Sequence, residues 1–469
     1  MHKILFFDAS ELADFHNVSF ELNTPVKLQH NPVLTKDQPW ESLICTYGSV
    51  IKDSDHYKMY YTQWWLDEKE PYDCLDEAIA YAESEDGLIW KKPNLNNISK
   101  VNNGNNNLLK RVLSADQPCV IKRDIAVGDK QYVMAYYGDF EPLGKGVRIA
   151  FSPDGVNWDL PGDVVWQTPI DKIAHNLSFY AADDTINFYF DPGLNKYILL
   201  RKVMYDGELV YDEKSHKDLM LEEQDCSRMI ARCESIDLVN WTNHEIILKP
   251  KKDNKQSDYH RLSITPYYNY YIGLLEIFHH KNDKNTVDIH LLYSKDSKTW
   301  IHPNESIPFI ANGNKGEWDG GVLFVQPTFI QEEKTIKIFY GGMDARMDEK
   351  EMAQSQAFGV GLAELTKDRF SAVRFNETEG SVLILIPDKV GMNVYINAIS
   401  DAKGAIKVAL LDGNKKEIDG CHFKDCDTIS SNAIAEILSW SNEKRIPSNT
   451  QFISLSGALA KIYSLTFTK

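Results

Sequence analysis

The sequence contains 469 residues, of which 43% are hydrophobic and 25% are charged, as in a globular chain with room for two or three domains. The formal net charge of −17 argues against a nucleic-acid partner, because phosphates demand a basic surface. The longest apolar runs, such as 198–200 and 382–386, are far shorter than the roughly 20 residues that a membrane span needs, so no span is expected.

The seven cysteines are scattered and contain no CxxC pair, which indicates neither a disulfide framework nor a zinc site. We therefore expect no cofactor and no metal site; a cation bound among clustered carboxylates is an alternative that has no motif behind it. At the N-terminus, the apolar run 4–7 is too short for a signal peptide, so the chain is expected to be cytoplasmic or a mature chain whose leader was removed. Residues 1–39 contain little besides this run, which predicts a lead-in segment that packs on the folded domains.

From residue 40 to residue 375 the sequence repeats. A turn of the form Ser-x-Asp-x-x-x-Trp follows an apolar strand in SEDGLIW (84–90), SPDGVNW (152–158), SIDLVNW (235–241) and SKDSKTW (294–300), and TKDRF (366–370) is a shortened copy. Each repeat also contains a first apolar strand and a second aromatic strand. The strand that precedes the turn is the third, and the residues after the turn can form a fourth. Five such units predict an all-β fold, a five-bladed β-propeller. Two stacked β-sandwiches, the alternative, would not produce this period.

These turns are similar to the Asp-boxes of sialidases, which have one more residue between Ser and Trp. We assign all five to folding, with Ser and Asp capping the turn and the aromatic residue packing between blades. After residue 375 the repeat ends, and short strands over 376–469 predict a small β-sandwich of the jelly-roll type. Its Trp440 fits an interface-burying role better than a sugar-stacking platform.

Each unit places a carboxylate at the start of its first strand, and the first strands of a propeller surround one axis. The five carboxylates are Glu41, Asp116, Asp184, Asp258 and Asp319. They predict an acidic funnel, and the second strands bring Asp139, Arg201, His279, His280 and Asp344 to the same rim. The alternative is that these carboxylates cap loops.

Carboxylates whose pKa values are moved apart by neighbours such as Arg201 suit acid/base cleavage of a glycosidic bond. Other chemistries lack their motifs: the sequence has no GxSxG, P-loop or HExxH. The adjacent His279 and His280 would point to opposite faces of a strand, so together they do not chelate a metal.

The strand-start carboxylates, the Ser-x-Asp-x-x-x-Trp turns and the segments LFFDASELADFHNV, DTINFYFDPGLNKYILLRK and GEWDGGVLFVQPTF resemble the five-bladed propeller glycoside hydrolases of families 32, 43, 62 and 68. They are most similar to a bacterial family-32-like branch with a C-terminal β-sandwich. The resemblance implies Glu41 as nucleophile or base, Asp184 as transition-state stabiliser and Asp258 as acid. This chain departs from family 32 because it lacks the WMNDPNG, RDP and EC motifs and has Asp258 where a Glu is usual.

The leading hypothesis is therefore a glycoside hydrolase with an oligosaccharide or polysaccharide substrate. Two alternatives are a glycan-binding protein without catalysis, and a phosphorylase, which would need a basic cluster built from Arg201, His260 and Arg261. The residues expected to position the substrate are Asp116, Asp319, Arg201, His260, Arg261, Trp40 and Trp318.

Overall fold

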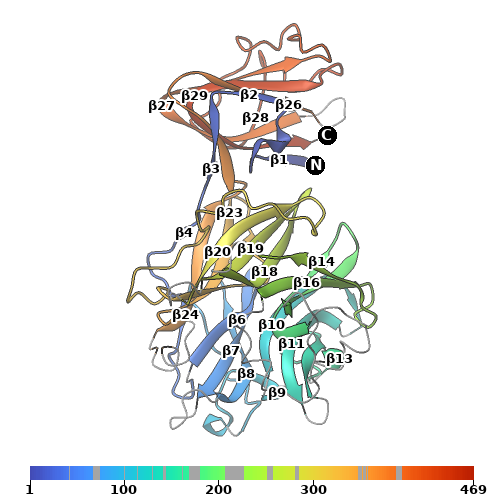
Figure 1. The fold of residues 1–469 in the computed structure, drawn as a ribbon, viewed down its shortest axis with the longest axis vertical. Helices are drawn as coiled ribbons and strands as arrows, with labels where there is room; N and C mark the ends of the chain where they lie inside the picture. Colours follow the sequence, from blue (N-terminus) through green and yellow to red (C-terminus); the bar gives the residue numbers. More distant parts are fainter. Residues whose placement is uncertain are drawn as a thin grey trace.

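The alternating apolar runs of the repeats form antiparallel strands that are grouped in several sheets, as Figure 1 shows. The computed structural model describes residues 1–41, 43–66, 74–99, 101–113, 115–128, 130–140, 144–160, 162–167, 180–205, 227–250, 257–279, 285–346, 351, 355, 357–386 and 393–468. Within these residues the fold is all-β, with two short 3-10 segments at Ala9–Glu11 and Asn102–Gly104. No helix in this described part of the chain is long and apolar enough to cross a membrane.

Three sheets of four strands each follow one another along the chain, and in each sheet the strands pair in sequence order. The first sheet contains β6 (Leu43–Asp53), β7 (His56–Leu66), β8 (Cys74–Ser84) and β9 (Leu108–Leu113). The second contains β10 (Ala115–Val127), β11 (Lys130–Phe140), β12 (Gly144–Ser152) and β13 (Asp163–Gln167). The third contains β14 (Tyr180–Asp191), β15 (Lys196–Tyr205), β16 (Ser227–Ser235) and β17 (Thr242–Leu248).

The last two repeats share one nine-stranded sheet, because β20 and β21 pair in parallel at Val287 and Val322. Its strands from the repeats are β18 (Ser257–Tyr267), β19 (Tyr270–His279), β20 (Thr286–Ser294), β21 (Val322–Val325), β22 (Ile330–Gln331), β23 (Thr335–Met343) and β24 (Phe358–Thr366). Two strands from the start of the chain, β4 (Val26–Lys27) and β5 (Leu34–Thr35), pair with β24. The outer strand beside β24 is thus supplied by the N-terminal segment, not by residues that follow β24.

The first strands of successive repeats contact one another in a closed ring. β6 contacts β10, β10 contacts β14, β14 contacts β18, β18 contacts β21, and β21 contacts β6. Hydrogen bonds join neighbouring members, such as the one from Ser49 Oγ to the carbonyl of Pro118. The arrangement is propeller-like, with the repeats placed around a common axis.

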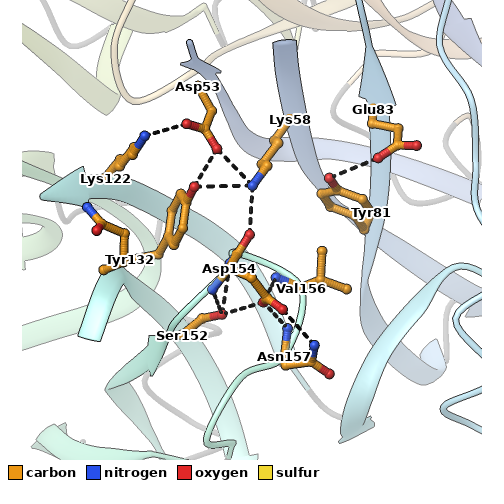
Figure 2. A network of polar contacts seen from close by, with 12 residues as sticks. Asp53, Lys58, Tyr81, Glu83, Lys122, Tyr132, Ser152, Asp154, Val156 and Asn157 are labelled. Carbon is orange, nitrogen blue, oxygen red and sulfur yellow. Dashed lines mark hydrogen bonds and ion pairs between the residues drawn. The ribbon is translucent and has the colours of Figure 1, made fainter. Parts of the chain in front are cut away.

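Four of the five repeated turns have the same hydrogen bonds, as the sequence pattern predicted. In each, the Asp Oδ1 accepts two backbone N–H groups, two and three residues later, at 2.7–3.0 Å; Asp154, for example, binds the amides of Val156 and Asn157 (Figure 2). The Ser Oγ also lies 2.9–3.1 Å from that Oδ1. We call these four segments the Ser-Asp turns.

The aromatic residue that closes each turn packs between two repeats. Trp158, for example, lies in a cluster with Tyr60 and Tyr81 of the first sheet and Met134 of the second. Trp90, Trp241, Trp300 and Phe370 occupy the corresponding positions in the other interfaces. Burying one large aromatic at each interface explains why the pattern recurs once per repeat.

The shortened fifth copy has a different role. Its Asp368 forms an ion pair with Lys3 and accepts hydrogen bonds from Tyr267 and, at 3.3 Å, from Ser464. These partners come from β1 (His2–Leu5), β18 and β29 (Phe452–Thr468), so Asp368 joins the propeller-like body to a separate sheet at the ends of the chain.

That sheet has eight strands and contains both termini (Figure 1). Its strands are β1 (His2–Leu5), β2 (Asp14–His16), β3 (Val18–Leu22), β25 (Ser371–Phe375), β26 (Gly380–Leu385), β27 (Asn393–Leu411), β28 (Asn432–Ile437) and β29 (Phe452–Thr468). β1 pairs with β29, β2 with β26 and β3 with β25. Trp440 is buried in the core of this sheet and donates to the carbonyl of Val408, which fits the interface-burying role.

Candidate active site

Four of the ring strands are interrupted at the same level. The pairing shifts between Cys45 and Gly48 in β6, between Asp116 and Cys119 in β10, between Ala181 and Ile186 in β14, and between Tyr259 and Arg261 in β18. Each shift leaves extra residues in the inner strand relative to its partner. Such bulges re-aim side chains and are common beside active sites, so this level of the axis is the candidate site.

The bulge in β10 shows the local cause. Pro118 cannot donate to the sheet, and Gln117 before it adopts a left-handed backbone with φ 57°. Buried Gln117 donates its N–H to Thr62 Oγ1 and accepts the N–H of Ile186 at its side-chain oxygen. Its backbone strain is therefore offset by bonds to the first and third sheets.

Side chains from the inner strands meet across the axis. The rings of Tyr47 (β6) and His260 (β18) are 6.2 Å apart, and Phe324 (β21) lies 4.3 Å from Tyr47. Arg261 donates to the carbonyl of Val325 and lies 3.4 Å from the sulfur of Cys119 (β10). We call these five residues Tyr47, Cys119, His260, Arg261 and Phe324, together with Glu276, the axial cluster.

Glu276 is fully buried in this cluster and forms a pair with His260, whose Nδ1 lies 2.7 Å from Oε2. Its other oxygen accepts the N–H of Val325 at 2.7 Å. Burial raises the pKa of Glu276 to about 7, against the opposing effects of Arg261, the Val325 amide and Lys202. Burial, together with the charges of Lys202, Arg228 and Arg261, lowers the pKa of His260 well below its usual value. Glu276 therefore keeps its proton at pH values below about 7, while His260 stays neutral.

Asp258 lies two residues before His260 on β18, and its Oδ2 is 4.0 Å from the Nε of Arg228. Asp258 on β18 is thus a carboxylate with a cationic partner, and Glu276 on the neighbouring strand β19 is a carboxyl group with a raised pKa. Two carboxyl groups in such different environments are the arrangement on which acid/base cleavage of glycosidic bonds depends.

The other carboxylates expected in the funnel have different surroundings. Asp116 lies at the β10 bulge and accepts from Thr62 Oγ1. Glu41 forms an ion pair with Lys92 at 2.8 Å and accepts the amides of Asp37 and Gln38. Asp319 forms an ion pair with Lys27 of β4 at 2.6 Å and accepts from Tyr340. Asp184 belongs to the bulged part of β14, but its side chain lies outside the described residues.

The structure therefore places Asp258, His260 and Arg261 on one inner strand and Asp116 at the bulge of β10, and it pairs Glu41 and Asp319 with lysines from other segments. Arg201 is buried in β15, on the strand face that alternates with that of Lys202. Trp318 packs over β23 and β24, where a Cβ at Gly342 or Gly361 would come within 2.7 Å of its ring. Trp40 is half-buried just before β6.

Of the expected rim residues, His279 and Asp344 are described, whereas His280 lies outside the described residues, as does the side chain of Asp139.

Glu276 was not among the expected site residues, because it lies inside a second strand and not at the start of a first strand. No sequence motif indicated the other residues near the site, which are Tyr47, Gln117, Lys202, Arg228 and Phe324. One feature of the sequence does indicate the site. Pro118 lies within the apolar run of an inner strand and therefore predicts a bulge there. Bulges in the other inner strands are then expected at the same height along the axis.

A surface pocket of about 630 Å³ lies at the other end of the sheets, near the Ser-Asp turns. It is lined by residues such as Asp53, Lys58, Tyr81 and Glu83, several of which Figure 2 shows in ion pairs or hydrogen bonds. Lys58 lies 2.9 Å from Asp53 and donates to the carbonyl of Asp154, which ties the first sheet to the second. Because these polar groups are engaged in joining two repeats, we assign this pocket to the architecture.

No protein-family model matches the chain, and no curated protein sequence matches it significantly. Its fold is similar to that of BT0996 in its RGII complex, with a TM-score of 0.50 and 13% identity over 73% of this protein and 92% of that one. Several of the structural neighbours are glycoside hydrolases of propeller-type families. They include a glycosyl hydrolase from Bacteroides ovatus, with a TM-score of 0.48 and 14% identity over 74% of this protein and 95% of that one.

Another neighbour is a family 43 arabinoxylan arabinofuranohydrolase from Bacillus subtilis, with a TM-score of 0.41 and 10% identity over 95% of this protein and 99% of that one. The likeness to BT0996 agrees with the fold that the sequence motifs imply. At these identities the likeness concerns the fold, and the chemistry depends on the residues of this protein.

Proposed function

We propose that the chain is a glycoside hydrolase that cleaves an oligosaccharide or polysaccharide at the axis of a five-bladed β-propeller, residues 40–375, with residues 1–39 as a lead-in and residues 376–469 as a β-sandwich. The observation that carries the proposal is the Glu276–His260 pair, together with Asp258 two residues before His260 on the same strand. A carboxyl group with a pKa of about 7 is suited to donate a proton to a leaving group at neutral pH.

In this proposal the Glu276–His260 pair holds and delivers the proton, and Asp258 supplies the carboxylate. Asp184, which the family resemblance assigns to transition-state stabilisation, belongs to the bulged segment of β14 at the same level. The ion pair with Lys92 favours a structural role for Glu41, so we do not place it among the reacting groups. Asp116, Arg261 and Tyr47 would then contact the substrate or fix the groups that do.

The test is a panel of oligosaccharides assayed with the wild type and with the single variants Asp258→Asn and Glu276→Gln. We expect each variant to lower kcat by about 10²- to 10⁴-fold, the usual contribution of a general acid or base. Asp401→Asn, which changes an exposed carboxylate in the terminal sheet, is the matched control and should retain full activity. Losses below about tenfold in both variants of an active enzyme would reject the assignment. Binding of a glycan without cleavage would select the non-catalytic alternative.

One observation favours phosphorolysis as a second candidate. Lys202, Arg228 and Arg261 all act electrostatically on His260, so three cations surround the candidate site. A phosphate nucleophile would need such a cluster. If turnover requires inorganic phosphate and yields a sugar phosphate, the enzyme is a phosphorylase; if turnover is unchanged by phosphate, it is a hydrolase.

A further inference from the structure

A second group of ligand-type side chains lies on β19 and β20, away from the axial cluster. His279, Asp288 and His290 each offer one atom, and these three atoms lie within 4.8 Å of one another. His279 is three residues after Glu276 on a strand without a shift at this point, so the two side chains point to opposite faces of the sheet. This group is therefore separate from the proposed reaction.

One nitrogen of each histidine lies close to the same carboxylate oxygen of Asp288. His279 Nε2 lies 2.8 Å from Asp288 Oδ1, and His290 Nε2 lies 3.1 Å from the same oxygen. His290 Nε2 is buried and is not aligned for a hydrogen bond with any described residue. Ligand atoms around a tetrahedral zinc ion, with bonds of about 2.0–2.1 Å, are separated by roughly 3.3 Å, so small side-chain movements would admit an ion.

The outer nitrogens of both rings are also held. His279 Nδ1 lies 3.2 Å from Ser257 Oγ, and His290 Nδ1 lies 3.1 Å from His302 Nε2. Metal-binding histidines usually donate their second N–H to such a partner, which fixes the tautomer and turns the free nitrogen toward the metal. Both rings here have this outer support, and both present Nε2 to Asp288.

We propose that His279, Asp288 and His290 form a binding site for a divalent transition metal of the zinc class. Two imidazoles and one carboxylate are a donor set that suits zinc with one open position. His279 and Asp288 are partly exposed, with side-chain exposures of 30% and 16%, so the fourth position is open to water. The ion ties β19 to β20, and Ser257 extends this support to β18.

The experiment begins with the full-length protein stripped by a chelator and dialysed against zinc, and bound metal is measured by mass spectrometry. We expect about one zinc per molecule, and we expect Asp288→Asn and His290→Gln to lower the affinity by at least about 100-fold, since even loss of an outer partner costs 10- to 100-fold. Ser257→Ala should therefore show a smaller loss. His422→Gln is the matched control, because His422 also contacts a carboxylate, Glu417, at 2.6 Å but has no second histidine in its pair.

Cobalt replaces zinc in a second measurement on the wild type, which does not depend on how the variants fold. Visible d–d bands of a tetrahedral ion, without a thiolate charge-transfer band, would support the site. A thiolate band would assign the metal to cysteine and overturn the proposal. So would a wild type that retains no zinc, or folded Asp288→Asn and His290→Gln variants that bind zinc as tightly as the wild type.

Discussion

The two ends of the repeated sheets differ in how similar their residues are from one repeat to the next. At the Ser-Asp turns, four repeats use the same residue types and the same hydrogen bonds, and the closing aromatics fill equivalent interfaces. At the bulged level of the axis, β6, β10 and β18 contain Tyr47, Gln117 and His260, which are three different residue types. Repetition thus marks the residues that hold the repeats together, whereas the residues differ between repeats at the level where we propose the active site.

The difference between the two ends can be tested by measuring stability and activity separately in the same variant. The largest stability loss is expected from Trp158→Ala at a Ser-Asp turn, because it removes a buried aromatic from an interface between sheets. We expect a decrease of about 3–5 kcal/mol in the free energy of unfolding, measured by urea denaturation, with kcat unchanged in the folded population.

Val239→Ala is its control, since Val239 lies in the equivalent region of another Ser-Asp turn but is 74% exposed, and it should have almost no effect. A selective loss of kcat in folded Trp158→Ala would break the division between the two ends.

The next effect is a pH dependence of opposite sign at the two ends. Glu276 has its pKa raised to about 7 in the folded state, so its contribution to stability is complete below the unfolded pKa of about 4.5 and is lost as pH rises through 7. Comparing the wild type with Glu276→Gln between pH 5 and 8 should reveal up to about 3 kcal/mol of this dependence, with the wild type losing more stability as pH rises.

Glu234, next to a Ser-Asp turn, is the counterpart. Burial opposes its ionisation, but Lys196, Asn243 and Arg232 outweigh this and lower its pKa to about 2. Its contribution is therefore present above pH 4.5 and is lost as pH falls toward 2. Glu234→Gln should flatten the acid side of the stability profile and leave the side above pH 6 unchanged. The same pH profile for both variants would contradict the assigned environments.

The smallest effect is expected for Lys122→Ala in the network of Figure 2. Lys122 forms an ion pair with Asp53, but its side chain is 36% exposed. We expect a loss below about 1 kcal/mol that shrinks further in high salt, because solvent screens such pairs. Urea denaturation at low and high salt measures this loss, and an effect above about 2 kcal/mol would mean that surface ion pairs, not the aromatics, hold the repeats together.

Sequence periodicity predicted the strands of the repeats and the hydrogen bonding of the Ser-Asp turns, because both are determined by residues close together in the chain. It did not predict that β4 and β5 would complete the edge of β24, since the pairing partners are more than 300 residues apart. Nor could it predict the lysines that pair with Glu41 and Asp319, because Lys92 and Lys27 come from other segments.

The candidate site was predictable in part. The position of Asp258, His260 and Arg261 at the start of the first strand of their repeat was sufficient to predict that they lie close together on one inner strand. Glu276 was missed because its pairing with His260 depends on the extra residue in β18, and a bulge of one residue has no strong sequence signal there. Only the Pro118 bulge could be inferred from its residue type.

The terminal sheet also has a consequence for how the protein is made. His2 of β1 pairs with Phe467 of β29, and Lys3 of the same strand forms an ion pair with Asp368. A ribosome releases the first strand long before its partner exists, so β1 must wait while the repeats assemble. The repeats can fold progressively during synthesis, whereas the terminal sheet can close only after β29 has been synthesised. Chains stalled before β29 would therefore expose the apolar face of β1, including Ile4, to chaperones and proteases.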